Sequence, residues 1–69
     1  MNKTRAEQIG GRLRELRGDR PQKEVADAVN VSVMAISKYE RGLIIPGDEV
    51  KIALAEFYNT TVEAIFFTF

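Results

Sequence analysis

The chain has 69 residues and a formal net charge of zero, and it contains neither Cys nor His. These absences exclude disulfides, the usual zinc ligands, Cys and His nucleophiles, and an imidazole general base. No apolar run approaches the roughly 20 residues of a membrane span, and the N-terminus lacks the apolar region of a signal peptide. We therefore expect one cytoplasmic domain over residues 1–69, without enzymatic activity, metal, cofactor, small-molecule ligand or membrane association.

The first predicted helix covers about residues 5–17. Thr4 and Glu7 form the T-x-x-E pattern of a capping box at its start. Gly10 and Gly11 weaken the helix locally; they either allow another helix to come close or simply cost stability. The apolar residues that recur at helical spacing are Ala6, Ile9, Leu13 and Leu16.

Two short helices joined by a tight turn are predicted over about 21–28 and 33–41. Asn30 lies at the turn, where the chain needs a positive φ that Asn tolerates well. Ser32 can cap the next helix with its hydroxyl, and Gly42 suits the position after its end. This pattern is typical of a helix-turn-helix, which presents its second helix to a partner such as the DNA major groove. The residues expected to face inward are Val25, Ala26, Val29, Val31, Ile36 and Tyr39.

A fourth helix is predicted from about Asp48 to Tyr58, and a short fifth helix follows Thr61, which can cap it. Asn59 is expected to adopt a left-handed conformation between them. No strand pattern is longer than the tail of residues 67–69. The sequence therefore predicts an all-α, compact five-helix bundle. The apolar faces of the last two helices are expected to be Val50, Ile52, Ala53, Leu54 and Phe57, and then Val62, Ile65 and Phe66.

The exposed side of the third helix is the candidate surface for reading DNA, because a recognition helix contacts base edges from its N-terminal part. Lys38 can donate to guanine O6 or N7, whereas apolar side chains can only contact thymine methyls or exclude water. Met34 has an alternative role in the core or in binding another protein. The predicted base-facing residues are Val33, Met34, Ala35 and Lys38.

Candidate phosphate contacts surround this helix. Gln22 lies at the start of the second helix, where a side-chain amide and free backbone N–H groups can hold a phosphate. The alternative is that the Gln22 side chain has no partner. The first 23 residues carry seven basic and three acidic residues, which can orient the chain on a polyanion or form an ordinary solvated surface. The predicted phosphate-binding residues are Gln22, Lys23, Ser32, Ser37 and Arg41.

Two further features concern assembly. Arg17 and Glu40 lie at helix ends that converge, so a bidentate ion pair can fix the first helix to the third. The C-terminal segment EAIFFTF exposes more aromatic surface than a short helix can bury. Phe67 and Phe69 are predicted to pair across a homodimer axis, or the tail over 67–69 pairs as a strand. The alternative is a frayed end with one Phe folded back.

Several motifs together resemble one known family. They are IGGRLRELR, QKEVADAVNVS, ISKYERG, and P-x-x-E followed by an apolar helix and TTVEAIFF. Over about residues 6–67 the chain resembles the Cro/phage-repressor, or XRE, type of helix-turn-helix. The resemblance implies a lambda-repressor-like domain of a bacterial or phage transcriptional regulator, usually a homodimer on double-stranded DNA. It also implies that Gln22 binds phosphate, that Arg17 and Glu40 pair, and that the base-facing positions are Val33, Met34, Ala35 and Lys38.

The chain also departs from that family's pattern. The connection before Gln22 is about two residues short, and Pro21 stands where Ser or Thr commonly caps the helix, which makes Asp19 the candidate cap. Residues 43–45 are Leu-Ile-Ile, where many relatives carry Lys or Arg. An alternative function is therefore an antitoxin-like or anti-regulator module that binds a protein partner through this loop and the apolar side of the third helix.

Overall fold

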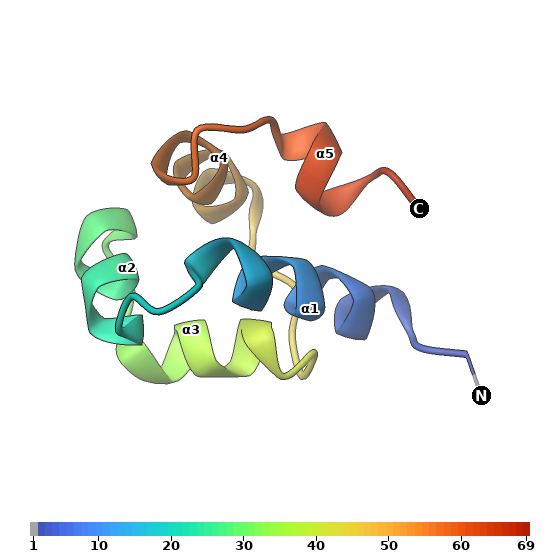
Figure 1. Cartoon of the computed structure of the whole chain (residues 1–69), viewed down its shortest axis with the longest axis horizontal. Helices are drawn as coiled ribbons and strands as arrows, with labels where there is room; N and C mark the ends of the chain where they lie inside the picture. The colour runs from blue at the N-terminus through green and yellow to red at the C-terminus, as the bar shows by residue number, and fades with distance from the viewer. Residues whose placement is uncertain (1) are drawn as a thin grey trace.

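The computed structural model describes residues 2–69, and every regular element in that range is a helix: α1 (Arg5–Arg17), α2 (Gln22–Val29), α3 (Val33–Glu40), α4 (Asp48–Phe57) and α5 (Val62–Phe66). In Figure 1, α1 crosses the middle of the molecule, with α3 below it, α4 and α5 above it, and α2 at the left. None of the described helices has the length and hydrophobicity needed to cross a bilayer. The predicted all-α, five-helix fold is confirmed, and each predicted helix ends within one residue of its observed bounds.

The start of α1 is fixed by the predicted capping box. The Thr4 backbone N–H donates to Glu7 Oε1 at 2.9 Å, and the Glu7 N–H donates to Thr4 Oγ1 at 3.1 Å. The hydrogen bond from the Thr4 backbone lowers the pKa of the Glu7 carboxyl below its usual value. Two N–H groups that have no partner within the helix are thereby satisfied.

The start of α2 differs from the prediction. Pro21, where the sequence predicts that the helix begins, occupies the N-cap instead, with an extended backbone (φ −68°, ψ 149°), and no side chain caps the helix. The predicted cap from Asp19 is therefore wrong, because a side chain caps from the N-cap position itself and Asp19 lies two residues earlier. The Glu24 N–H donates to the Pro21 carbonyl at 3.1 Å, and the N–H groups of Gln22 and Lys23 are left to other partners.

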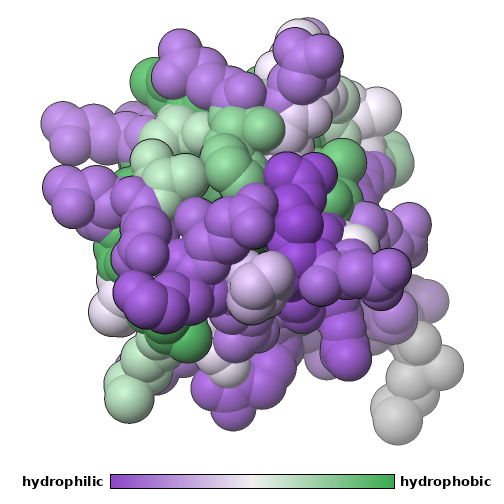
Figure 2. All heavy atoms as spheres, turned by 60° about the vertical axis from the view of Figure 1, so that its left-hand side comes forward, coloured by the Kyte–Doolittle hydropathy of each residue, from purple (hydrophilic) through white to green (hydrophobic). Residues whose placement is uncertain are grey.

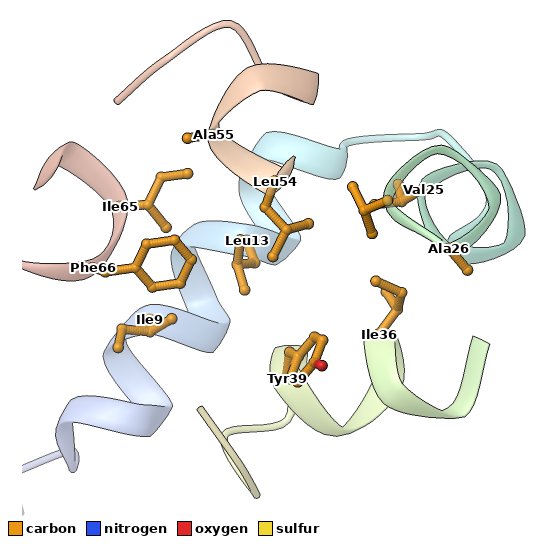
Figure 3. Close-up of a cluster of buried hydrophobic side chains, with 11 residues drawn as sticks. Ile9, Leu13, Val25, Ala26, Ile36, Tyr39, Leu54, Ala55, Ile65 and Phe66 are labelled. Atoms are coloured by element: carbon orange, nitrogen blue, oxygen red, sulfur yellow. The ribbon is translucent and has the colours of Figure 1, made fainter. Parts of the chain in front are cut away.

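The core lies where all five helices converge. Figure 3 shows Leu13 of α1 near its centre, with Leu54 of α4, Phe66 of α5 and Tyr39 of α3 around it. Full burial of a large apolar side chain stabilises a fold by about 1.5–3 kcal/mol, so these side chains hold the helices in one arrangement. The buried apolar residues are Ile9, Leu13, Val25, Ala26, Val29, Ile36, Tyr39, Leu54, Ala55, Ile65 and Phe66.

One predicted core residue is misplaced. Ile52 is 52% exposed, whereas Ala55, which the apolar pattern did not single out, is 3% exposed. Leu54 and Ala55 define the buried side of α4. Ile52 precedes Leu54 by two residues, which is about 200° around a helix of 3.6 residues per turn. It therefore points away from the core.

Helices α1 and α3 come into backbone contact, and this requires glycine at two positions. A Cβ on Gly10 would lie 2.5 Å from the carbonyl oxygen of Glu40 and 2.6 Å from that of Tyr39. Gly42 has φ 74°, and a Cβ there would lie 2.7 Å from Glu7 Cα. The interpretation of Gly10 as a close-contact glycine is confirmed, and the contact holds α3 tightly against α1.

Candidate nucleic-acid interface

The turn between α2 and α3 has the geometry that the sequence predicts. Asn30 adopts a left-handed conformation (φ 61°, ψ 47°), and the Val31 N–H donates to the Ala26 carbonyl at 3.0 Å. Val31 is half-buried and packs against the core. Ser32 then caps α3, because its hydroxyl oxygen accepts from the Ala35 N–H at 3.0 Å. The left-handed residue, the backbone hydrogen bond and the cap together fix the conformation of the short connection between the two helices.

The outer side of α3 is mostly apolar at its N-terminal end. Val33 is 43% exposed and Met34 is 66% exposed. Ala35 is half-buried against the core, so it offers less surface than its two neighbours. Lys38 lies one turn further along and is half-buried. The alternative in which Met34 belongs to the core is therefore wrong, since its side chain extends into solvent.

Arg17 and Glu40 form the bidentate pair at the junction of α1 and α3. Arg17 Nε lies 2.7 Å from Glu40 Oε2, and Arg17 Nη2 lies 3.0 Å from Glu40 Oε1. The Glu40 side chain is only 4% exposed, and its hydrogen bond raises the pKa of Arg17. Arg17 Nη1 also donates to the Arg20 carbonyl at 2.7 Å, which ties the connection before α2 to the same pair.

Gln22 has a hydrogen-bond partner within the protein, whereas the sequence suggested either a phosphate contact or no partner at all. Its Nε2 donates to Glu40 Oε1 at 3.0 Å, so the first residue of α2 is bonded to the last residue of α3. A terminal amide carries two N–H groups, and this bond uses one of them. The signal in the sequence was weak: the Arg17–Glu40 pair was expected, but nothing in the spacing placed Gln22 beside it.

The other candidate phosphate contacts are only partly free. Lys23 Nζ lies 3.0 Å from Asp27 Oδ2 in an exposed pair, which contributes little energy and can be exchanged for another anion. Arg41 Nε donates to Ser37 Oγ at 3.1 Å and to the Ser37 carbonyl at 3.3 Å. Ser32 Oγ accepts as the cap of α3, which leaves its own O–H able to donate.

The basic residues among the first 23 positions do not gather on one side of the molecule. Arg12 lies on the α5 side, where Nη1 donates to the Ala64 carbonyl at 2.7 Å and Nη2 donates to the Thr68 carbonyl. Arg20 lies 5.2 Å from the Phe57 ring centroid. The surplus of positive charge in the first 23 residues is therefore spread over more than one side of the molecule, with Arg12 holding the C-terminal segment.

Exposed apolar residues also occur at the other end of α3. Leu43, Ile44 and Ile45 are 59%, 45% and 45% exposed, and the Leu43 N–H donates to the Lys38 carbonyl at 3.0 Å. They are separated from the N-terminus of α3 by the length of an eight-residue helix, about 12 Å. Figure 2 shows the side of α2, where hydrophilic side chains surround several smaller hydrophobic areas.

The two candidate dimer residues have different surroundings. Phe67 is 55% exposed, with Lys51 Nζ 5.0 Å from its ring centroid. Phe69 is 51% exposed and lies beside two guanidinium groups, with Arg12 Cζ at 4.2 Å and Arg5 Cζ at 4.9 Å from its ring centroid. The tail is therefore folded back on α1 at Phe69, while Phe67 lies beside Lys51 of α4.

Comparison with known proteins agrees with this geometry. A family model described as Helix-turn-helix (HTH_3) matches residues 12–65, which include the whole of α2, the turn and α3. No curated protein is similar enough to count as a match. The family match covers well over half of the chain. The chain therefore belongs to the helix-turn-helix family of the XRE type and is a DNA-binding helix-turn-helix domain.

Proposed function

We propose that this protein is a sequence-specific transcriptional repressor that inserts α3 into the major groove of double-stranded DNA as a homodimer. The observation that carries the proposal is the orientation of α3. On its inner side, Ile36 and Tyr39 are buried in the core. On its outer side, Val33 and Met34 are exposed in the first turn, directly after the N-cap residue Ser32. A helix that projects in this way can enter a groove N-terminus first.

The proposed contacts divide into two groups. Lys38 supplies hydrogen bonds to base edges, and the apolar residues at the start of α3 contact thymine methyls. This set has few donors, so DNA shape is expected to contribute to the choice of site. The proposed base-facing residues are Val33, Met34, Ala35 and Lys38, and the proposed phosphate contacts are Gln22, Lys23, Ser32, Ser37 and Arg41.

Selection from a random duplex pool at about 100 mM salt tests this function. We expect enrichment of a two-fold symmetric sequence whose half-sites lie about 34 Å apart, one turn of DNA. Affinity for that sequence should fall with salt, with a log–log slope of about −0.9 for each phosphate contacted. Transcription from a promoter carrying the site should decrease in the presence of the protein. No enrichment in the pool would contradict the proposal.

The proposed dimer uses Phe67, with Phe69 as a weaker contributor because two guanidinium groups already cover part of its ring. Sedimentation of the wild-type chain should show a concentration-dependent dimer, and Phe67→Ala should shift the equilibrium towards monomer. If Phe67→Ala and the wild type sediment alike as dimers, the interface lies elsewhere.

A second candidate function is a protein-interaction module, and the exposure of Met34, Leu43, Ile44 and Ile45 favours it. A contiguous exposed apolar patch is typical of a protein interface, and Leu43, Ile44 and Ile45 are three consecutive exposed apolar residues. Such a module would form a complex that survives 1 M salt, because apolar contacts are not screened, whereas a phosphate-dependent complex would dissociate. A protein complex retained at 1 M salt, together with the absence of DNA selection, would favour this function over the first.

A further inference from the structure

Glu40 is an unexpected residue to find beside a candidate phosphate contact. It is a carboxylate, and a lone negative charge would repel DNA. Its two oxygens, however, receive three N–H groups, two from Arg17 at 2.7 and 3.0 Å and one from Gln22 at 3.0 Å. The charge is thus neutralised by the guanidinium and directed inward, with the Glu40 side chain almost completely buried.

The hydrogen bond from Gln22 settles which way its amide faces. A carboxylate can only accept hydrogen bonds, so the Gln22 nitrogen, and not its oxygen, must face Glu40. The second N–H of the same nitrogen is not used in this bond. Gln22 is half-buried at the first position of α2, where no side chain caps the helix. A phosphate at this end can therefore accept from the remaining Nε2 N–H and from backbone N–H groups of the first turn.

We propose that Glu40 is a positioning residue for DNA binding, which orients the Gln22 amide so that its nitrogen donates to Glu40 and to a DNA phosphate at once. The inference rests on the proposed function, since it assigns a partner to one of its phosphate contacts. Because Glu40 is the last residue of α3 and also binds Arg17 of α1, the same carboxylate fixes the phosphate contact relative to the recognition helix.

A double-mutant cycle tests the inference. The four chains are the wild type, Gln22→Ala, Glu40→Gln and the double variant. Their affinities are measured by fluorescence anisotropy with a labelled duplex enriched by the wild-type chain, at several salt concentrations. Glu40→Gln removes a negative charge and so alters affinity by itself. The informative quantity is therefore the coupling between the two positions, and not either single loss.

We expect Gln22→Ala to weaken binding by about tenfold in the wild-type background, as for a hydrogen bond to a charged group. In the Glu40→Gln background, where the amide can turn either way, the same change should cost less than about twofold. Gln8→Ala is the matched control, because Gln8 is exposed on α1 and should leave affinity unchanged in both backgrounds. Equal losses for Gln22→Ala in both backgrounds would overturn the inference.

Nuclear magnetic resonance of the wild-type chain decides the matter even if Glu40→Gln does not fold. The chain has two glutamines, Gln8 and Gln22, so the Gln22 side-chain amide is assigned by its loss in Gln22→Ala. One of its two protons should be shifted downfield in the free protein and should stay so when the duplex is added, while the other shifts on binding. Movement of the first proton to the position of a solvated amide on adding DNA would overturn the inference. A wild-type chain that binds no duplex would instead remove the proposed function itself.

Discussion

The two sides of α3 differ in how tightly they are packed. On the inner side, Ile36 and Tyr39 are buried, and the backbone at Tyr39 and Glu40 lies against Gly10. On the outer side, Met34 extends into solvent and Lys38 has no ion-pair partner among the described residues. One eight-residue helix therefore has a buried side that belongs to the scaffold and an exposed side that is the proposed reading surface. Substitutions on the inner side should change stability, and those on the outer side should change binding.

Gly10→Ala should have a large effect on the packing of α1 against α3. The added methyl group would overlap two carbonyl oxygens of α3, and neither helix backbone can move without disturbing the core. We expect a loss of about 3 kcal/mol or more in the free energy of unfolding, measured by urea denaturation. That is a large part of the total expected for a domain of this size.

Gly11→Ala is the matched control for that experiment. Gly11 is the next residue of α1, and a Cβ there would meet nothing within 4 Å. The alanine should stabilise the helix by about 0.5–1 kcal/mol. If both substitutions destabilised the chain equally, the contact between α1 and α3 would not be the cause.

Ile36→Ala and Met34→Ala compare the two sides of α3 directly. The two residues lie two positions apart on one helix, but Ile36 is 2% exposed and Met34 is 66% exposed. Ile36→Ala should cost about 2–5 kcal/mol of stability through loss of buried surface and formation of a cavity. Met34→Ala should change stability by less than about 0.5 kcal/mol. Thermal unfolding followed by circular dichroism measures both, and similar losses would contradict the assigned orientation of α3.

Lys38→Ala should separate binding from folding. Removing the one cationic side chain among the proposed base-facing residues should reduce discrimination between sites by about 1–3 kcal/mol, with stability unchanged within about 0.5 kcal/mol. The measurement is competition between the selected duplex and single-base variants. Unchanged discrimination across all positions would remove Lys38 from the reading surface.

A further effect, confined to high pH, concerns Tyr58. Burial, followed by the negative charge of Glu40, raises the pKa of Tyr58 to about 12, compared with about 10 for a free phenol. The fold therefore favours the neutral phenol. The stability that this contributes should be fully present below pH 10 and lost as the pH rises from 10 to 12. Urea midpoints over this range should fall more steeply for the wild type than for Tyr58→Phe, and identical slopes would contradict the assignment.

Local sequence signals predicted the helices and the turn well because each depends on neighbouring residues. The capping box at Thr4, the left-handed Asn30 and the Ser32 cap all act within four residues along the chain. The misplacement of Ile52 shows the limit of this reasoning. An apolar residue on a helix was assigned to the core from its type, but the packing of α4 against its neighbours chose the side centred on Leu54 and Ala55 instead.

The amino-acid sequence alone predicts the five helices and the helix-turn-helix. These follow from helical periodicity, capping chemistry and motif spacing, which act over short distances along the chain. The packing of the helices, by contrast, brings Gln22 into a hydrogen bond with Glu40, places Arg12 on the C-terminal segment and leaves Ile52 exposed. Such contacts join residues from 18 to more than 50 positions apart. Their geometry depends on how whole helices pack, and one helix pattern is compatible with many packings.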